Sequence, residues 1–405
     1  MKRLTHTQLS LIGLSVLGLI GSAILLKFAP VPFLWSFVLW GLVFVTLAYV
    51  SKGANLRAVF CNLAIIGLFL AVAELYFWRA QAKPSEHGSD EVSYRMEGGI
   101  NDGYRDLNHP ILGYAAKKGV IADAQKYRGD ELVYDVVYTI DDNGLRRSAP
   151  VDPSNLRGCI FFFGGSFTIG EGVEDHESMP YRVGVLTEGQ YRIFNFGFHG
   201  YGPHQMLSAL ESGLVRDIAQ CKPRFVVYQA LDRHVLRTAG LVHWGKNGPR
   251  YVLEEDGRVR RAGTFADKPA ATRFTDAFLR QSGKSHLYTW IRGRSKSYQV
   301  SDEHIATFGA IVEQARDIAL ADNPRGVFHV LLWNFDTALT RRVTNELAVR
   351  NVKVHPVLES ILPAAAYRTT YALGPHDHHP NPATYDLIAR YVVRHIITAG
   401  QESAK

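Results

Sequence analysis

Residues 159–170 read Cys159-Ile160-Phe161-Phe162-Phe163-Gly164-Gly165-Ser166-Phe167-Thr168-Ile169-Gly170, an apolar run that ends in two glycines and a serine. A short, continuous apolar run is typical of a strand that is buried on both faces. The glycines let the backbone turn sharply, so the hydroxyl of Ser166 stands uncrowded where the strand ends and a helix begins. A simple strand-ending turn would explain the same residues, so this segment needs support from elsewhere.

Downstream, strand-like and helix-like segments alternate. Apolar, β-branched runs predict strands at 160–163, 192–196, 225–230, 327–333 and 352–357. Amphipathic patterns predict helices at 178–186, 204–218, 303–321 and 383–397. This alternation indicates an α/β fold in which helices cover both faces of a parallel sheet. Such sheets carry their sites beyond the carboxyl ends of the strands, which is where Ser166 falls.

A second segment with chemical potential is Asp377-His378-His379-Pro380-Asn381, just before the last helix. His379 can act as a general base toward a serine hydroxyl, and Asp377 can fix its tautomer and stabilise the imidazolium. His376 and His378 suggest a metal site at first glance. Adjacent histidines diverge, however, and no second ligand motif accompanies them, so we predict no metal.

The segment around Ser166 differs from other known glycine-rich site patterns. Thr168 stands where a G-x-S-x-G elbow has its last glycine, and no lysine follows Gly170 as in a phosphate loop. No G-x-G-x-x-G opens a helix, so we predict no cofactor. The glycine-rich loop 195–202 follows the second strand, and the backbone N–H of Gly200 could face the serine as an oxyanion donor. The alternative is a plain connecting loop.

The blocks G-G-S-F-T-x-G, N-x-G-x-x-G-Y-G and D-x-H-P-N, in this order, resemble the SGNH/GDSL hydrolases over about residues 157–400. The resemblance implies a flavodoxin-like three-layer α/β/α domain with serine ester chemistry. Carried over by position, Ser166 corresponds to the nucleophile and first oxyanion amide. Gly200 corresponds to the second oxyanion donor, and Asp377 and His379 to the catalytic pair.

One family block departs from the pattern. Leu231 stands where the family has the asparagine whose amide completes the oxyanion hole. Loss of one oxyanion donor typically costs on the order of 10²–10³ in rate. Either another group substitutes or the activity is low or altered. We favour His234 as the replacement, because it follows within a turn and can carry a positive charge.

The N-terminal region, residues 1–80, contains three apolar runs at about 9–26, 28–50 and 58–77. Each is long enough to cross a hydrocarbon core of about 30 Å as a helix. We therefore predict three transmembrane spans; a cleaved signal peptide followed by a buried hairpin is the alternative. A slight bias of flanking basic residues predicts a cytoplasmic N-terminus, and hence a periplasmic or otherwise extracytoplasmic domain beyond the inner membrane.

Residues 81–156 form a polar linker and a β-rich lead-in, with a strand predicted at 132–140. The hydrolase-like domain, 157–400, is interrupted by an insertion at about 237–300. The insertion is either a substrate-facing cap or an ornament of the fold. It contains a hairpin signal at Asp256-Gly257.

The cysteines leave a choice open. Cys159 opens the nucleophile strand and Cys221 opens a later one. If the two strands are parallel neighbours, both thiols lie at one sheet edge, where an oxidising compartment could bridge them. Two buried free thiols are the alternative. No pair of cysteines has zinc-ligand spacing.

The net charge of +7 is scattered along the chain, so we predict no nucleic-acid partner. The first hypothesis is a membrane-anchored serine esterase that cleaves an acylated envelope carbohydrate or a lipid-linked substrate through an acyl-serine intermediate. A second is an O-acyltransferase that modifies an envelope polysaccharide with a multispan membrane partner. A third is a non-catalytic polysaccharide-binding or assembly protein on a decayed hydrolase scaffold, which Leu231 would favour.

Overall fold

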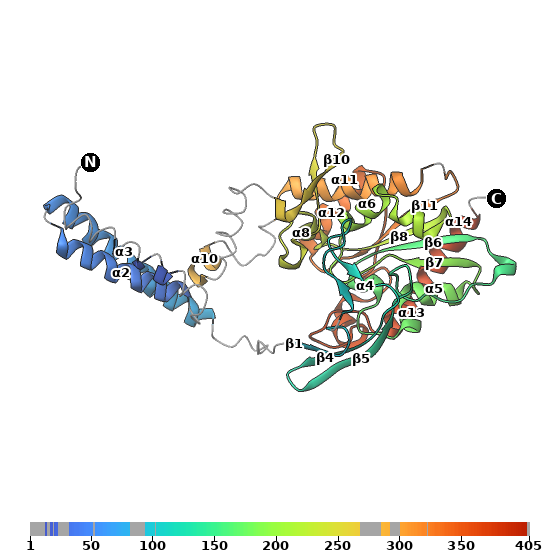
Figure 1. The fold of residues 1–405 in the computed structure, drawn as a ribbon, viewed down its shortest axis with the longest axis horizontal. Helices are drawn as coiled ribbons and strands as arrows, with labels where there is room; N and C mark the ends of the chain where they lie inside the picture. The colour runs from blue at the N-terminus through green and yellow to red at the C-terminus, as the bar shows by residue number, and fades with distance from the viewer. Residues whose placement is uncertain are drawn as a thin grey trace. The chain divides into compact units, whose positions relative to one another are not determined.

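The computed structural model describes residues 13, 17–18, 20–22, 32–51, 53–81, 94–101, 103–267, 285–291, 300–321 and 323–402. The chain forms two compact units (Figure 1). The first comprises Met1–Glu91 and Lys268–Tyr298, and the second comprises Val92–Asp267 and Gln299–Lys405. The predicted lead-in therefore shares a unit with the sheet, whereas part of the predicted insertion groups with the N-terminal helices.

The first unit contains two long apolar helices, α2 (Pro32–Val50) and α3 (Ala54–Gln81). Their segments Phe33–Val50 and Ala54–Ala80 have the length and hydropathy to cross a membrane. They coincide with the second and third predicted spans. The first predicted span, 9–26, lies outside the described residues except at isolated positions.

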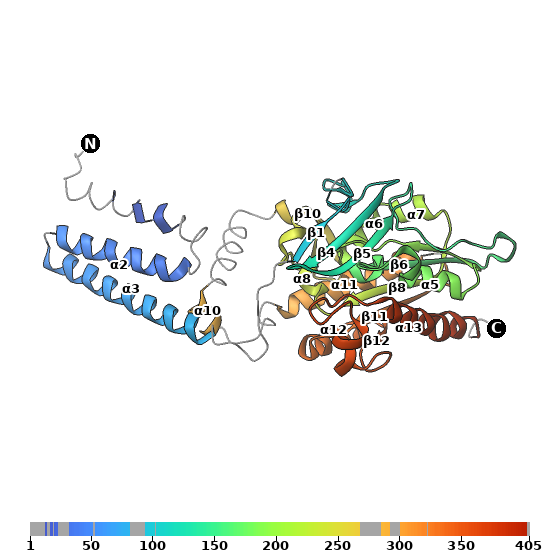
Figure 2. The same ribbon diagram turned by 90° about the horizontal axis from the view of Figure 1, so that it is seen from below.

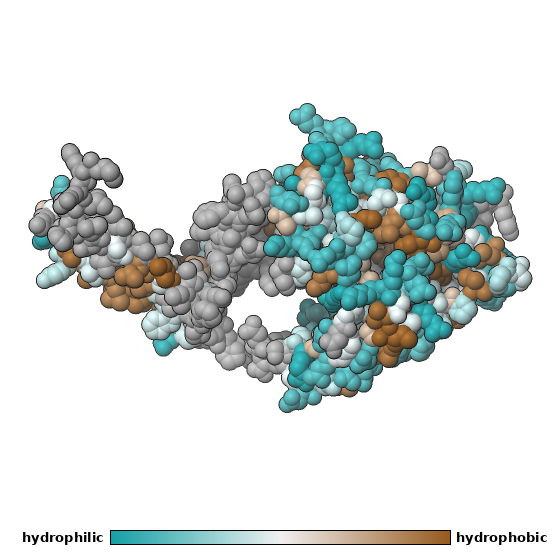
Figure 3. All heavy atoms as spheres, in the orientation of Figure 1, coloured by the Kyte–Doolittle hydropathy of each residue, from teal (hydrophilic) through white to brown (hydrophobic). Residues whose placement is uncertain are grey.

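The helix pair leaves much of its apolar surface uncovered. Figure 3 shows hydrophobic side chains gathered along this pair. Exposed large apolar side chains include Leu42, Val45, Ile65, Leu68 and Phe69. A core helix of a soluble protein would bury such residues, so this exposure favours an apolar surrounding.

A short helix from the insertion, α10 (His286–Ile291), packs against α3 within the same unit. The carboxylate of Glu74, which is fully buried, accepts hydrogen bonds from Ser285 Oγ at 2.7 Å and from the N–H groups of His286 and Leu287 at 2.7 and 3.0 Å. The carboxylate therefore satisfies N–H groups at the start of α10 that have no partner inside the helix.

The second unit is built on a five-stranded sheet with the order β12-β11-β8-β6-β7, and every neighbouring pair is parallel. Its strands are β6 (Gly158–Gly164), β7 (Tyr191–Asn195), β8 (Pro223–Leu231), β11 (Val327–Trp333) and β12 (Lys353–Pro356). Numbered along the chain, the order is 2-1-3-4-5, which is the flavodoxin-like doubly wound arrangement. The predicted α/β class and all five predicted strands are confirmed.

Helices cover both faces of this sheet (Figure 2). One face carries α6 (Pro203–Glu211), α11 (Asp302–Ala319) and α12 (Thr337–Val349), and the other carries α5 (Met179–Leu186) and α13 (Pro382–Val392). The remaining helices are α4 (Ser166–Ile169), α7 (Leu214–Ala219), α8 (His234–Thr238) and α14 (Ala399–Glu402). The single helix predicted at 204–218 is wrong, because Gly213 at φ +79° interrupts it between α6 and α7.

Strand β6 is apolar at successive positions because both of its faces are buried. Phe161 and Phe163 pack into the core on the α6 face, whereas Ile160 and Phe162 pack into the core on the α13 face. All four side chains are at most 3% exposed. Full burial of one such side chain contributes about 1.5–3 kcal/mol, so both faces of β6 stabilise the sheet.

The lead-in forms an antiparallel sheet of β1 (Tyr94–Glu97), β4 (Ile121–Arg128) and β5 (Glu131–Thr139), together with a short pair of β2 (Arg105–Asp106) and β3 (Ala115–Ala116). The strand predicted at 132–140 is confirmed. In the insertion, β9 (Pro249–Leu253) and β10 (Val259–Thr264) form the hairpin predicted at Asp256-Gly257.

The two strand-opening cysteines are joined. Cys159 and Cys221 form a disulfide with their Cα atoms 6.6 Å apart. The strands β6 and β8 are parallel neighbours, so both cysteines lie at the N-terminal end of the sheet, whereas Ser166 lies at the other end of β6. The structure thus selects the bridged alternative.

Candidate active site

The turn that carries Ser166 has glycine at two crowded positions. Gly164 ends β6 with φ +149°, and a Cβ atom there would lie 2.2 Å from Thr168 Oγ1. A Cβ atom on Gly165 would lie 2.7 Å from Nη1 of Arg237. At Gly164 the backbone oxygen of Gln229 would also lie 2.7 Å away, so glycine is required there. At Gly165 the backbone oxygen of Tyr201 would lie 3.0 Å away, so a larger residue would displace Arg237 and crowd the turn.

Ser166, His379 and Asp377 meet at the carboxyl end of the sheet. Ser166 Oγ lies 2.9 Å from His379 Nε2, although 213 positions separate the two residues. On the other side of the ring, His379 Nδ1 lies 2.6 Å from Asp377 Oδ1. With the proton on Nδ1 donated to the carboxylate, Nε2 is left as an acceptor for the serine O–H. This is the arrangement of a nucleophile, a general base and an orienting carboxylate.

Hydrogen bonds to its backbone hold the loop that presents His379. Asp377 Oδ1 also accepts a hydrogen bond from the backbone N–H of His379 at 3.0 Å, and the carbonyl of His379 accepts one from Leu373 N at 2.8 Å. Asn381 then caps α13, because its side-chain oxygen accepts from Thr384 N at 3.0 Å. The histidine is therefore held between a tight loop and a capped helix start.

Lys126, on β4 of the lead-in, is a site residue that the sequence did not indicate. Its Nζ lies 2.6 Å from Asp377 Oδ2, the oxygen that His379 does not use. Burial would raise the pKa of Asp377, but the hydrogen bond and charge of His379 and the charge of Lys126 outweigh it and lower that pKa. Asp377 is therefore ionised at neutral pH, as an orienting carboxylate must be.

A second site residue that the sequence did not indicate is the carboxylate Glu171, which follows α4. Its Oε2 lies 2.6 Å from His199 Nδ1 and 3.7 Å from His379 Nε2, and its Oε1 lies 3.8 Å from Lys126 Nζ. Burial opposes its ionisation, but His379, His199 and Lys126 together hold the pKa of Glu171 well below its usual range. The imidazole of His379 is thus flanked by an anion on each side.

These anions set the basicity of His379. Burial alone would lower the pKa of the imidazole, but Glu171 and then Asp377 outweigh burial and raise it. A general base works only when it is neutral, so activity should fall as the pH drops through this raised pKa. Glu171→Gln removes the largest raising influence, and the acidic limb of kcat/KM against pH is expected to move to lower pH.

The matched control is Glu131→Gln, which removes the same charge from a side chain that is 74% exposed. Its acidic limb should coincide with that of the wild type. An unmoved limb in Glu171→Gln would show that this carboxylate does not govern the base.

Arg146 holds the segment that follows Ser166. Its side chain is fully buried and donates to the carbonyls of Ile169, Gly170 and Val173 at 2.5–2.7 Å, and to Asp175 Oδ1 at 2.8 Å. Arg146→Met would remove the buried charged donor from all four acceptors. Gly170 O and Asp175 Oδ1 would each keep a second donor, the N–H groups of Val173 and Thr139 respectively. We expect a loss of about 3–5 kcal/mol in unfolding free energy, or roughly 6–20 °C in Tm.

Thermal unfolding of the full chain in detergent micelles measures this loss. The control is Arg147→Met at the neighbouring exposed position, which should unfold within a few degrees of the wild type. Equal Tm values for the two variants would contradict the anchoring role of Arg146.

The catalytic cavity has a volume of about 750 Å³. Ser166, Glu171, Gly200, Leu231 and His379 line it, together with Arg105, Arg237, Trp244 and Lys246. Gly200 has φ +76°, and its carbonyl accepts a hydrogen bond from Trp244 Nε1 at 3.3 Å. The cavity therefore brings the serine and the glycine-rich loop together, with cationic side chains at its wall.

His234 lies close to the nucleophile turn, because its Nε2 would be 3.6 Å from a Cβ atom on Gly165. It is fully buried, its Nδ1 is 2.6 Å from the hydroxyl of Tyr228, and it is not among the residues that line the catalytic cavity. Leu231 does line that cavity. Arg237 also lies beside this turn: its Nη1 would be 2.7 Å from a Cβ atom on Gly165, and it donates to the carbonyl of Tyr201. Of the two, Arg237 lines the cavity together with Ser166, which makes it a further candidate for the missing oxyanion donor.

No family model and no curated protein matches the chain. Among solved structures, a putative lipolytic protein of the G-D-S-L family from Desulfitobacterium hafniense is 14% identical, with 58% of this chain and 97% of that chain covered and a TM-score of 0.30. The acetyl xylan esterase Est2A from Butyrivibrio proteoclasticus is 12% identical, with 64% and 68% covered and a TM-score of 0.36. A catalytic mutant of Axe2, an acetylxylan esterase from Geobacillus stearothermophilus, is 17% identical, with 59% and 94% covered and a TM-score of 0.31.

Similarities this weak do not assign a function to the chain. The interpretation of the site therefore depends on its own geometry. The sheet order and the meeting of Ser166, His379 and Asp377 at the carboxyl ends of the strands are what the SGNH/GDSL resemblance of the sequence implies.

Proposed function

We propose that this protein is a membrane-anchored serine esterase that cleaves acyl esters through an acyl-serine intermediate. The observation that carries the proposal is the chain of contacts from Ser166 Oγ to His379 Nε2 at 2.9 Å and from His379 Nδ1 to Asp377 at 2.6 Å. A serine hydroxyl is a weak nucleophile unless an oriented base removes its proton in the transition state. These contacts supply both the base and its orientation.

In the acylation step, Ser166 Oγ attacks the ester carbonyl while its proton passes to His379 Nε2. The carbonyl π electrons move to the oxygen, and the tetrahedral oxyanion forms. When the oxyanion collapses, the C–O bond of the ester breaks, and the leaving alcohol takes the proton from Nε2. Water then repeats the sequence on the acyl-serine, with His379 again as base, and releases the carboxylic acid.

The oxyanion would be received by the N–H of Ser166 at the start of α4, the N–H of Gly200 and the guanidinium of Arg237. Arg237 lines the same cavity as Ser166 and Gly200. A cation in a partly dehydrated site can take the place of the missing amide at Leu231, because both offer N–H donors to developing negative charge.

Arg237→Leu is accordingly expected to lower kcat by about 10²–10³ with little change in KM, since the lost contact belongs to the transition state. Arg237→Lys, which keeps the charge but not the fork of donors, should recover part of the loss. The control is Arg233→Leu on the exposed side of the same turn. A kcat for Arg237→Leu within a few-fold of the wild type would remove Arg237 from the oxyanion site.

The membrane anchor and the compartment are supported by separate observations. The helices α2 and α3 have the length, hydropathy and exposed apolar side chains of spans. The disulfide between Cys159 and Cys221 suits an oxidising compartment, which agrees with the extracytoplasmic orientation that the flanking charges predict. An acylated envelope carbohydrate is the proposed substrate, and exposed Trp244 at the cavity offers an apolar ring face for a sugar.

Covalent labelling tests the proposal. The full chain in detergent micelles is treated with a fluorophosphonate, digested and analysed by mass spectrometry. We expect a single phosphonylated peptide, modified at Ser166, and none in Ser166→Ala. A folded wild-type protein that remains unlabelled would favour a binding protein on the same scaffold, and so would modification of a different serine.

A further inference from the structure

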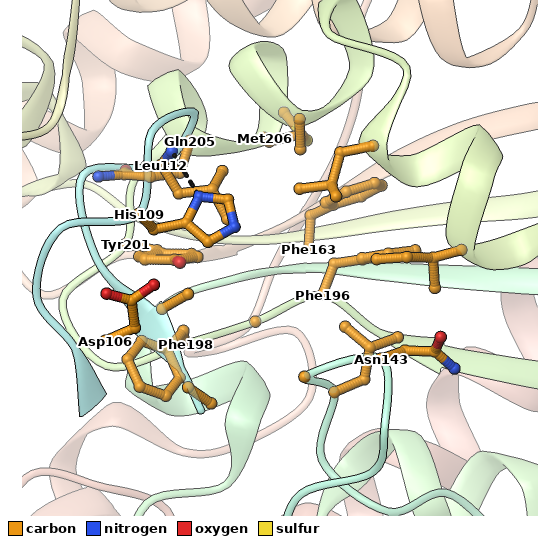
Figure 4. A pocket seen from close by; sticks show the side chains of 18 of the residues that line it. Asp106, His109, Leu112, Asn143, Phe163, Phe196, Phe198, Tyr201, Gln205 and Met206 are labelled. Carbon is orange, nitrogen blue, oxygen red and sulfur yellow. Dashed lines mark hydrogen bonds between the residues drawn. The ribbon is translucent and has the colours of Figure 1, made fainter. Parts of the chain in front are cut away.

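A second cavity, of about 440 Å³, lies over the ends of β6 and β7 on the α6 face of the sheet. Figure 4 shows the rings of Phe163 and Phe196 on one side of it and those of Tyr201 and Phe198 on the other, with Met206 of α6 nearby. Its lining is predominantly apolar. Protein interiors are normally close-packed, and small-molecule sites are concave, mostly apolar pockets with a few polar groups, so a pocket of this size and lining is a candidate ligand site.

This cavity is separate from the catalytic one, although the two share a wall. In the segment 112–116, Leu112 and Ala115 line the apolar cavity, whereas Gly113 and Tyr114 line the catalytic cavity. The segment 197–201 is divided in the same way. The hydroxyl of Tyr201 joins the two segments by donating to the carbonyl of Tyr114 at 2.5 Å. A ligand in the apolar cavity therefore lies behind the wall, where Ser166 does not reach it.

The rim of the cavity carries charge. Its polar groups are Asp106, His109, Lys117, Lys118 and Asn143. Asp106 accepts from Asn108 N at 3.0 Å, and His109 Nδ1 accepts from Ile111 N and Leu112 N at 3.3 Å. In the described part of the chain, neither lysine forms an ion pair, and both are exposed. With a neutral His109, the rim has an excess of one positive charge, which complements an anionic head group.

The volume of the cavity limits the length of the alkyl chain that it can hold. At about 30 Å³ for each water-sized group, 440 Å³ accommodates roughly fifteen such groups, and a methylene is close to that size. A single alkyl chain of about twelve carbons fits, whereas the two long chains of a phospholipid do not. Burial of each methylene contributes about 0.8 kcal/mol, so the chain would supply most of the binding free energy.

We propose that this cavity binds the alkyl chain of a single-chain fatty acid, with the carboxylate at the Lys117–Lys118 rim. The proposal concerns a ligand that is bound and not cleaved, and it does not depend on the proposed esterase activity.

Photolabelling of the full chain in lipid nanodiscs tests this binding site. The probe is dodecanoate with a diazirine at the end of its chain, and labelled residues are located by mass spectrometry. We expect saturable labelling within 194–210, which unlabelled dodecanoate suppresses. A probe with the same chain and a trimethylammonium head should label at least tenfold less. Saturable labelling is expected to be equal in Ser166→Ala, because Ser166 lines the other cavity.

Two variants challenge the site itself. Ala209→Trp places an indole in the cavity and should reduce labelling at least tenfold, whereas Ser212→Trp, exposed at the end of α6, should not. Should Ala209→Trp fail to fold, Lys117→Ala with Lys118→Ala changes only the exposed rim and should weaken labelling several-fold. Labelling that is unsaturable, that falls around Ser166, or that survives both the filled cavity and the neutral rim would overturn the proposal.

Discussion

Ser166→Ala is expected to lower kcat for a short-chain aryl ester by on the order of 10⁶, because alanine lacks the hydroxyl on which the proposed acyl intermediate forms. The hydroxyl of Ser166 contacts His379 Nε2 at 2.9 Å, and the substitution removes that oxygen while it keeps the Cβ atom, so we expect the turn and the base to stay in place. A residual rate above that in water should persist, because the oxyanion donors remain. Burst-phase and steady-state kinetics with the full chain in detergent micelles measure both quantities.

The matched control is Ser212→Ala, at an exposed position on the end of α6, which should turn over ester like the wild type. Turnover in Ser166→Ala within tenfold of the wild type would place the observed activity on another residue or a contaminant. Combined with a fluorophosphonate adduct at Ser166, such a result would separate a reactive serine from a catalytic one.

The parallel sheet could be predicted because its strands are locally unambiguous. A strand such as β6, with phenylalanines packed into both cores, leaves a continuous apolar run between turn signals. The sequence of helix α12 has an equally clear helical pattern, although the helix is not among those predicted above. Leu339, Val343 and Leu347 are spaced by four and are buried, and Asp336 caps the helix by accepting from the N–H groups of Ala338 and Leu339.

The residues of the candidate site also fall into two groups, those that the sequence could predict and those that it could not. Ser166 and His379 lie beside a glycine turn and a capped helix start, which are local features that sequence alone reveals. Lys126 contacts Asp377 across 251 positions from a strand of the lead-in, and nothing in its neighbours marks it. Glu171 resembles any charged residue after a short helix until the fold turns it toward His379. Contacts made by tertiary packing leave no periodic or turn signal.

Asp377→Asn is expected to lower kcat by on the order of 10⁴ with the fold intact. An asparagine amide can offer its N–H₂ to His379 Nδ1, which would place the ring proton on Nε2, where it faces Ser166 and blocks proton transfer. The substitution also removes the partner of Lys126 at 2.6 Å and one of the anions that raise the pKa of His379. Lys126→Met separates these effects, because it keeps the Asp377–His379 contact and should cost far less.

The other carboxylate cannot rescue the aspartate variant, and this makes the test decisive. Glu171 approaches His379 at Nε2, at 3.7 Å, on the side of the ring that faces Ser166. It can therefore stabilise the imidazolium charge but cannot hold the proton on Nδ1. If Asp377→Asn kept a rate within tenfold of the wild type at every pH, orientation by Asp377 would not matter. Glu171→Gln would then have to show the larger loss, with Glu171 rather than His379 as the base.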